Sequence, residues 1–284
     1  MTNIISRIGR YGVDGYLVIV GLAIVLIFVF MALFAELISP YNPIDIVGPP
    51  VQPPSDKYIF GTDSLGRDVL SRLIYGARTI MGVIAVSAAV SMLIGVPLGL
   101  ISGYFGGYID RILSVIMDSI YAFPGLILAI AVASVLGPGI YNAAFAISVV
   151  YIPTYFRMVR GHVLSLKETL FVEAAKSLGA TNTRIMFRHI LGNTLYIVTV
   201  IFSLNVSDAV LTEAGLSFLG LSVSSPTPDW GFDLRNGQRY FLSGYWWPVA
   251  IPGFAIILLA LGFGLLGEGL NTIVGGGNTR GRQP

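Results

Sequence analysis

The sequence holds few residues that could make or break covalent bonds. It has no cysteine, which excludes disulfides, thiolate metal sites and a cysteine nucleophile. Its two histidines, His162 and His189, are 27 residues apart, whereas a zinc metalloprotease needs two histidines and a glutamate on one helix. None of the three lysines, Lys57, Lys167 and Lys176, follows a glycine, so no phosphate-binding P-loop is present. The sequence therefore does not indicate an enzyme.

Acidic residues within or beside long apolar stretches are the other candidates for chemistry. A charge inside a membrane is costly, so such residues are usually paired or functional. Asp118 lies where it can pair with Arg111 or Arg157. Two interpretations stay open for Asp208: it lines a solute path, or it makes a hydrogen bond between subunits. Glu213 is predicted to lie near the outer membrane boundary, where it orders the following loop.

These residues must be positioned by membrane-spanning helices. Of the 284 residues, 55% are hydrophobic and 11% are charged, compared with about 25% charged residues in soluble domains. A spanning helix needs about 20 mainly apolar residues. A charge-free run at 119–156 is too long for one crossing and is divided at 136–139 by Leu-Gly-Pro-Gly. The sequence thus predicts an all-α integral membrane protein with six transmembrane helices, at 15–38, 79–103, 112–136, 140–158, 193–212 and 240–267.

The distribution of lysine and arginine predicts how these helices are oriented. Eleven of the basic residues fall on the side that holds both termini, and six fall on the other side. Cytoplasmic loops carry the excess of lysine and arginine, so both termini are predicted to be cytoplasmic. The chain then begins with a cytoplasmic segment at 1–14, and an extracytoplasmic loop at 39–78 follows the first helix. The core at 79–272 holds the other five helices, a cytoplasmic loop at 159–192 and an extracytoplasmic loop at 216–245. A cytoplasmic tail at 273–284 ends the sequence.

The long cytoplasmic loop has the pattern of two short helices joined by a glycine. Ser165 and Glu168 form a capping-box pattern for a helix start. Gly179 stands where a helix would end, because glycine takes positive φ without strain. Thr181 or Asn182 can cap the second helix. From the residues alone, two interpretations stay open: an amphipathic helix lying on the membrane lipid, or an element that binds a partner protein.

This segment resembles the EAA loop of the permease subunits of ABC importers. The resemblance lies in Glu-Ala-Ala at 173–175, then Gly179, then His-Ile-Leu at 189–191. In that family the loop is a coupling helix that seats in a cleft of the cytoplasmic ATPase. Two positions depart from the family pattern, since His189 replaces the usual isoleucine and Gly192 the usual proline. The resemblance implies an ATPase-coupling role for Glu173, Ala174, Ala175, Leu178, Gly179 and Phe187.

Five further stretches are similar to the second, C-type permease of the dipeptide/oligopeptide/nickel family. They occur in order between about residues 40 and 271, and they read GTDSLGRDVLSRLIYGAR (61–78), GYFGGYIDR (103–111), AFPGLILAI (122–130), LTEAGLSFLGL (211–221) and PTPDWG (226–231). The resemblance implies the type I ABC importer permease fold in a multi-pass protein of the plasma membrane. The expected partners are a homologous permease in a heterodimer, two ABC ATPases and an extracytoplasmic substrate-binding protein. No nucleic acid and no cofactor in this chain are expected, because ATP and magnesium would be bound by the ATPases.

The same resemblance suggests where the solute and the binding protein would contact the chain. Asp208 and Glu213 are candidates for the substrate pathway, and the outer loop offers Trp230, Arg235 and Arg239 to the binding protein. Short peptides are the expected solute, with oligosaccharides and nickel chelates as alternatives. A stand-alone secondary transporter is a rival class, but it would tend to show two related halves with broken helices. No internal repeat is visible in the sequence.

Overall fold

The computed structural model describes residues 13–276, and the regular elements of this part of the chain are all helices, apart from a single isolated β-bridge between Thr62 and Asp68. The predicted terminal segments, 1–14 and 273–284, fall almost entirely outside the described residues. The all-α prediction is confirmed. The helices are α2 (Val13–Leu33), α3 (Ala35–Ile38), α4 (Val69–Phe105), α5 (Gly107–Tyr121), α6 (Gly125–Leu136), α7 (Ile140–Leu166), α8 (Leu170–Ser177), α9 (Asn182–Arg184), the π-helix η2 (Ile185–Ile190), α10 (Leu191–Phe218), α11 (Trp230–Phe241) and α12 (Trp247–Gly276).

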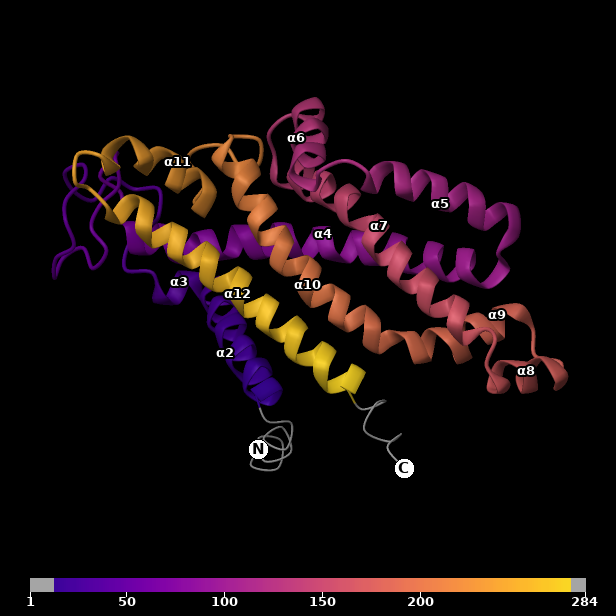
Figure 1. Cartoon of the computed structure of the whole chain (residues 1–284). Coiled ribbons are helices and arrows are strands. Elements are labelled where there is room, and N and C mark those ends of the chain that lie inside the picture. Colours follow the sequence, from indigo (N-terminus) through magenta and orange to yellow (C-terminus); the bar gives the residue numbers. More distant parts are fainter. Residues whose placement is uncertain (1–12, 277–284) are drawn as a thin grey trace.

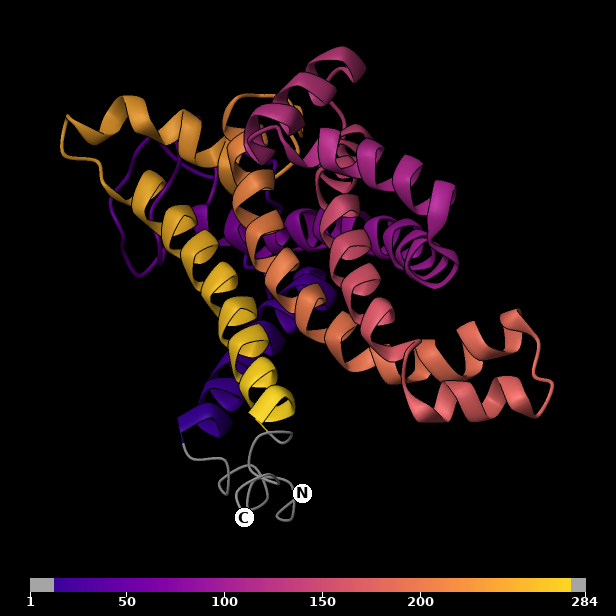
Figure 2. The ribbon, with the colours of Figure 1, turned by 45° about the vertical axis from the view of Figure 1, so that its right-hand side comes forward.

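The long helix α4 runs through the molecule and is crossed by the other long helices (Figure 1). It packs most extensively against α7, while α12 packs against α2 and α10. One apolar cluster fills the space among α2, α4, α7, α10 and α12. A second apolar cluster joins α4 and α7 to α8, η2 and the start of α10. Figure 2 shows α8 and its neighbours projecting at one end of the bundle, while α11 lies over the other.

Three glycines allow α4 and α7 to approach closely. Gly95, Gly99 and Gly103 repeat every fourth residue, which places them on one face of α4. A Cβ atom at these positions would lie 2.6, 2.6 and 2.8 Å from atoms of α7, and at Gly99 the nearest atom is the carbonyl oxygen of Phe156. The glycine repeat therefore lets the backbones of α4 and α7 pack against each other.

We expect Gly99→Ala to destabilise the protein by about 1–3 kcal/mol, because the added methyl group must push α7 away. Gly82→Ala is the matched control, since no atom lies within 4 Å of a Cβ at that position of the same helix. The control should be neutral or slightly stabilising, because alanine favours the helix over glycine. Thermal unfolding of the purified protein in detergent measures both variants, and equal unfolding temperatures would show that the close approach does not matter.

The prediction of one continuous third transmembrane helix at 112–136 is wrong. The chain makes two helices there, α5 and α6, bent by 91° at the intervening break. The break ends at Pro124, which has no backbone N–H to continue the helix and disfavours the helical conformation at Phe123. Hydropathy averaged over this stretch cannot detect the bend, because both halves are apolar.

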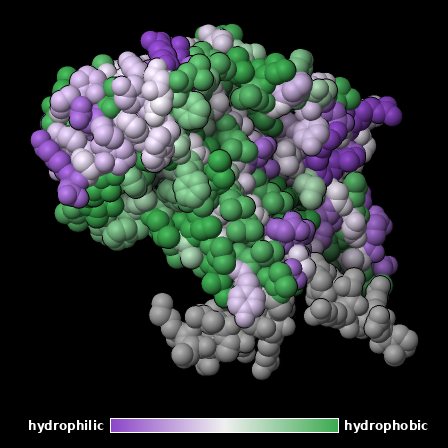
Figure 3. All heavy atoms as spheres, turned by 60° about the vertical axis from the view of Figure 1, so that its left-hand side comes forward, coloured by the Kyte–Doolittle hydropathy of each residue, from purple (hydrophilic) through white to green (hydrophobic). Residues whose placement is uncertain are grey.

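Four helices in the described part of the chain are long and apolar enough to cross a membrane: α2, α4, the run Asn182–Phe218 and α12. The number is five if the bent pair α5–α6 counts as one span. Helix α7 is not among them, and it carries Arg157 and Arg160 in its second half. Figure 3 shows one flank of the molecule as a broad hydrophobic surface, with hydrophilic residues gathered toward its ends.

The helices also extend further than the apolar stretches predict. Helix α4 begins at Val69 instead of residue 79, because the Asp68 side chain caps it by accepting a 2.8 Å hydrogen bond from the Ser71 backbone N–H. Helix α10 continues to Phe218 instead of residue 212. The predicted outer loop at 216–245 contains the helix α11, which begins at an Asp229 cap. Polar caps start helices at points that hydropathy does not mark.

Candidate functional site

The segment between α7 and α10 folds into two short helical pieces around a glycine corner, as predicted. Gly179 has φ +78°. Its N–H donates to the Lys176 carbonyl (2.9 Å), and the Ala180 N–H donates to the Ala175 carbonyl (3.0 Å). This pair of bonds is a Schellman motif, which requires the positive φ that glycine supplies. Thr181 then caps α9 by accepting from the Arg184 N–H at 3.4 Å, as expected.

The predicted capping box at Ser165 and Glu168 is not formed. Helix α7 continues through Ser165 to Leu166, and the Ser165 hydroxyl donates instead to the Gly161 carbonyl one turn earlier. Helix α8 begins at Leu170, two residues after Glu168, with Thr169 at its N-cap. The chain therefore passes from α7 into α8 with only a short turn between them.

One face of this corner is anchored on the bundle and the other is exposed. The anchor consists of four buried apolar residues of the second cluster: Val172, Ile185, Met186 and Ile190. Leu178 and Phe187 are exposed over 89% and 51% of their surface, and Leu170 over 82%. Glu173 and Ala174 are also exposed, and Ala175 is half-buried. The six residues predicted for coupling thus lie at one projecting corner, which presents apolar and acidic groups together (Figure 2).

Two ion pairs join α5 to α7, the helix that leads into this corner. Arg157 binds Asp118 with an N–O distance of 2.8 Å, which confirms one of the two predicted partners of Asp118. Arg160 binds Asp110 through two hydrogen bonds of 2.5 and 2.7 Å. Arg157 also lies over the ring of Tyr121, with 4.2 Å from the guanidinium carbon to the ring centre. The amphipathic helix α5 is therefore fixed to α7 along its length.

A cavity of about 420 Å³ lies between the α5–α6 bend, α7 and α10. Asp208, predicted from the sequence, lines this cavity together with Asn205 of the same helix. The Tyr151 hydroxyl donates to the Asp208 carboxylate at 3.0 Å and lies 3.0 Å from the Thr212 hydroxyl. Glu213 does not line the cavity. It is fully buried and accepts a 2.9 Å hydrogen bond from Ser222, so its pathway role is contradicted while its predicted contact with the following loop is present.

A sequence profile described as the binding-protein-dependent transport system inner membrane component matches residues 95–275. The chain belongs to this family of membrane permeases. A second profile, the N-terminal transmembrane domain of oligopeptide transport permease C, matches residues 16–54.

Relatives of this permease align over most of its length. It is 42% identical to the dipeptide transport system permease protein DppC of Alkalihalophilus pseudofirmus over 259 residues, which are 89% of this chain and 84% of the relative. It is 38% identical to the di/tripeptide transport system permease protein DppC of Pseudomonas aeruginosa, covering 88% and 84% of the two chains. It is 40% identical to the glutathione transport system permease protein GsiD of Pectobacterium atrosepticum, covering 87% and 82%. The permease is thus a multi-pass membrane protein of the C-type peptide permease group.

The end of the bundle opposite the glycine corner is held by Arg72, an arginine with no predicted role. Arg72 is 2% exposed, and its Nε and Nη2 donate to the Asp233 carboxylate at 2.9 and 2.6 Å. Its Nη1 donates to the backbone carbonyls of Pro43 and Pro226 at 3.1 and 3.3 Å. Asp63 lies 3.8 Å from the same guanidinium. Arg72 therefore ties α4, α11 and two outer loops together.

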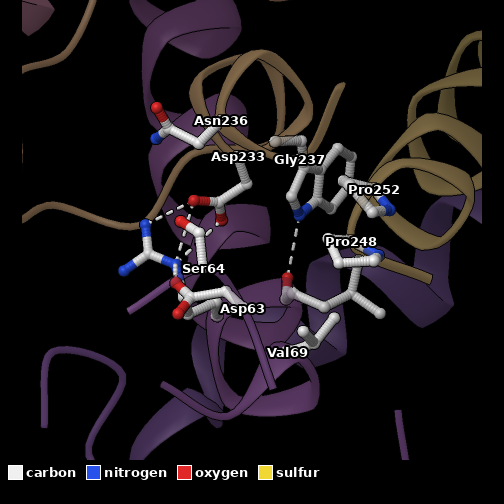
Figure 4. Close-up of a pocket in the computed structure, with 11 residues that line it drawn as sticks. Asp63, Ser64, Val69, Asp233, Asn236, Gly237, Pro248 and Pro252 are labelled. Carbon is white, nitrogen blue, oxygen red and sulfur yellow. Dashed lines mark hydrogen bonds and ion pairs between the residues drawn. The ribbon is translucent and has the colours of Figure 1, made fainter. Parts of the chain in front are cut away.

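A small cavity of about 20 Å³ lies beside Arg72. Figure 4 shows Asp63 and Asp233 close to each other at this cavity, with Asn236 on the adjacent turn of α11. Burial raises the pKa of Asp233 to about 6, although the neighbouring Arg72 opposes that shift. Burial also raises the pKa of Asp229, which caps α11 by accepting from the Phe232 N–H at 3.0 Å. The motif at 61–78 marked this region in the sequence, but the distance of 161 residues between Arg72 and Asp233 hid the pair.

Trp230 does not present its ring at the surface, contrary to the prediction. The side chain is fully buried, and its indole N–H donates to the Leu73 carbonyl at 2.9 Å. Its ring meets Phe28 of α2 edge to face, with 5.3 Å between the ring centres. Trp230 thus anchors α11 to the bundle. Arg239 is exposed and Arg235 is half-buried, so these two remain the candidates for contact with a partner.

Proposed function

We propose that this permease is one of two homologous subunits that together form the solute path of an ATP-driven importer. The observation that carries the proposal is the anchored glycine corner, whose outer face exposes Glu173, Leu178 and Phe187. A free amphipathic helix on lipid would bury its apolar residues in the membrane. Here the buried face already contacts the bundle, so the exposed groups are left for a protein partner. The partners are two cytoplasmic ATPases, which bind ATP and magnesium, and an extracytoplasmic binding protein.

The solute that we propose is a short peptide. This rests on the relatives, which are transport system permease proteins for dipeptides, di/tripeptides and glutathione. Oligosaccharides and nickel chelates remain alternative solutes, as the family resemblance of the sequence implies.

Co-expression with the two ATPases and the homologous permease tests the assembly. Co-purification of ATPases whose hydrolysis is stimulated by a peptide-loaded binding protein supports the proposal, and a permease that purifies without any ATPase contradicts it.

The topology that we propose has six spans, the third being the bent pair α5–α6 and the fourth being α7. The glycine corner and α11 lie at opposite ends of α10, whose 28 residues rise by about 42 Å. The excess of basic residues supports a cytoplasmic position for the glycine corner and both termini.

We expect single cysteines introduced into this cysteine-free chain to confirm the topology. A cysteine replacing Leu242, which is 95% exposed next to α11, should react with a membrane-impermeant thiol reagent in intact cells. A cysteine replacing Leu178 should react only after the membrane is opened. The reverse pattern would place the glycine corner outside and overturn the orientation.

The outer helix α11 is the surface that we propose for the binding protein. We expect Arg239→Ala combined with Arg235→Ala to weaken the stimulation of ATP hydrolysis by loaded binding protein, because both guanidiniums can pair with carboxylates. Basal hydrolysis should stay unchanged, and more binding protein should recover part of the loss. Lys57→Ala, an exposed basic residue in another outer loop, is the matched control. Unchanged stimulation curves for the double variant would leave α11 as a structural cap.

A further inference from the structure

Two polar residues of α10 face the same cavity. Asn205 and Asp208 are three positions apart, which places their Cβ atoms about 5–6 Å apart on one helix face. The opposite walls come from the α5–α6 bend and from α7, including Tyr121, Leu128 and Thr154. The volume of about 420 Å³ lies within the range of small-molecule sites, about 300–1,000 Å³. The cavity therefore has the size and the polar groups of a ligand site.

The Asp208 carboxylate can accept hydrogen bonds and is not paired with a basic side chain within residues 13–276. None of the ion pairs formed by residues 13–276 involves Asp208. Its oxygen Oδ2 accepts from Tyr151, which fixes the carboxylate in place without neutralising it. A carboxylate in the middle of a membrane-spanning helix is expensive unless a positive charge reaches it. A ligand that carries a cation would supply that charge.

Asn205 lies beside Asp208 but is almost fully buried. The residue is 9% exposed, and its Nδ2 is shielded from the cavity. Asp208 is exposed, so it is the polar group of α10 that a ligand in the cavity can reach.

We propose that this cavity binds the amino-terminal end of a peptide as it crosses the membrane. Asp208 pairs with the α-ammonium group, and Tyr151 holds the carboxylate in position. This deepens the proposed function and rests on it. Every peptide with a free amino terminus carries this ammonium group whatever its side chains, so such a site suits a path that must pass varied peptides. An oligosaccharide has no cation to offer it.

The test uses a reporter thiol in the cavity of the assembled complex. Thr154→Cys introduces a single thiol into this chain, whose labelling is read on the separated subunit. A cationic methanethiosulfonate reagent should react faster than an anionic one, by on the order of tenfold, because Asp208 attracts positive charge. Asp208→Asn should remove this preference, while the control Asp56→Asn in an exposed outer loop should keep it. If Thr154→Cys fails to assemble, Leu128→Cys reports on the same cavity.

Peptide protection then identifies the group that is recognised. Dialanine delivered by the binding protein should slow labelling several-fold in the chain with Asp208, and N-acetyl-dialanine should not. With Asp208→Asn, neither peptide should protect. The proposal is overturned if Asp208→Asn leaves the reagent preference unchanged, as it would if a basic residue of the partner permease neutralised Asp208. Equal protection by both peptides, or none by either, would also overturn it. Failure of the broader function would appear separately, as a complex without ATPases.

Discussion

Gly179→Val is expected to abolish most solute uptake while the permease still folds and inserts. At φ +78° a residue with a Cβ costs about 1–2 kcal/mol, and a β-branched residue is an outlier there. No atom lies within 4 Å of a Cβ at this position, so the effect comes from the backbone and not from a clash. A cost of this size lowers the population of the native corner about 5- to 30-fold. Uptake and stimulated ATP hydrolysis by the assembled complex are the measurements.

Gly179→Asn is the matched control, because asparagine tolerates positive φ far better than valine. It should keep most of the uptake. Immunoblots of membranes must show equal amounts of both variants, so that lost uptake reports coupling and not lost protein. Glu173→Lys, which reverses an exposed charge on the same corner, should also uncouple hydrolysis from uptake. Full uptake in the valine and lysine variants would show that the corner does not transmit the ATPase cycle.

Arg72→Met is expected to destabilise the permease by about 3–5 kcal/mol, because it leaves Asp233 buried without its partner. Thermal unfolding in detergent measures the loss. Arg78→Met is the control from the same helix, since Arg78 pairs with Glu36 at side-chain exposures of 43% and 72%. An exposed pair of this kind contributes about 0–1 kcal/mol. A similar loss in both variants would show that Arg72 does not hold the outer segments together.

The destabilisation by Arg72→Met should also depend on pH. The folded-state pKa of Asp233 is about 6 with Arg72 present, compared with 3.8 in its ordinary state, and loss of the arginine raises it further. A raised carboxyl pKa favours the folded state below the ordinary pKa, and this contribution is lost as pH rises through the folded pKa. The variant should therefore be closer to the parent at pH 5 than at pH 8. Adding Asp233→Asn should remove that difference.

Sequence reasoning located α2 closely, because a single apolar run makes a single helix there. It located α12 only approximately, since the predicted span at 240–267 is displaced from Trp247–Gly276. It also located the glycine corner, since Gly179 and Thr181 act through local backbone geometry that the sequence spells out. It missed features that depend on distant contacts. The bend at Pro124 lies inside the charge-free run at 119–156, and α11 is a polar helix held by the buried ring of Trp230. In the sequence Arg72 looks like a charged residue of a loop, and its role is visible only once the fold brings Asp233 beside it.

Within the candidate site, the sequence indicated Asp208 but could not show its cavity. The walls come from four helical elements, and the neighbour that fixes the carboxylate, Tyr151, is 57 residues away. Asn205 gave no signal, because one asparagine in an apolar helix is equally consistent with a buried hydrogen bond. Glu213 was a second candidate for the pathway because it belongs to the stretch at 211–221 that resembles the family, but the helix turns it to a buried face.

The close contact between α4 and α7 has a mechanical consequence. Three glycines leave no gap between the two helices, so we expect a displacement of one helix to be passed to the other. Helix α7 runs directly into the glycine corner at one end and carries Thr154 of the cavity wall about 18 Å away. A tilt of about 10° imposed at the corner would displace that wall by about 3 Å over this distance. Pro153 of α7 and Pro97 of α4 each remove a backbone hydrogen bond, so these are the points at which the pair can bend. Arg72 lies in the first turn of α4, so the same displacement reaches the end of the bundle that holds α11.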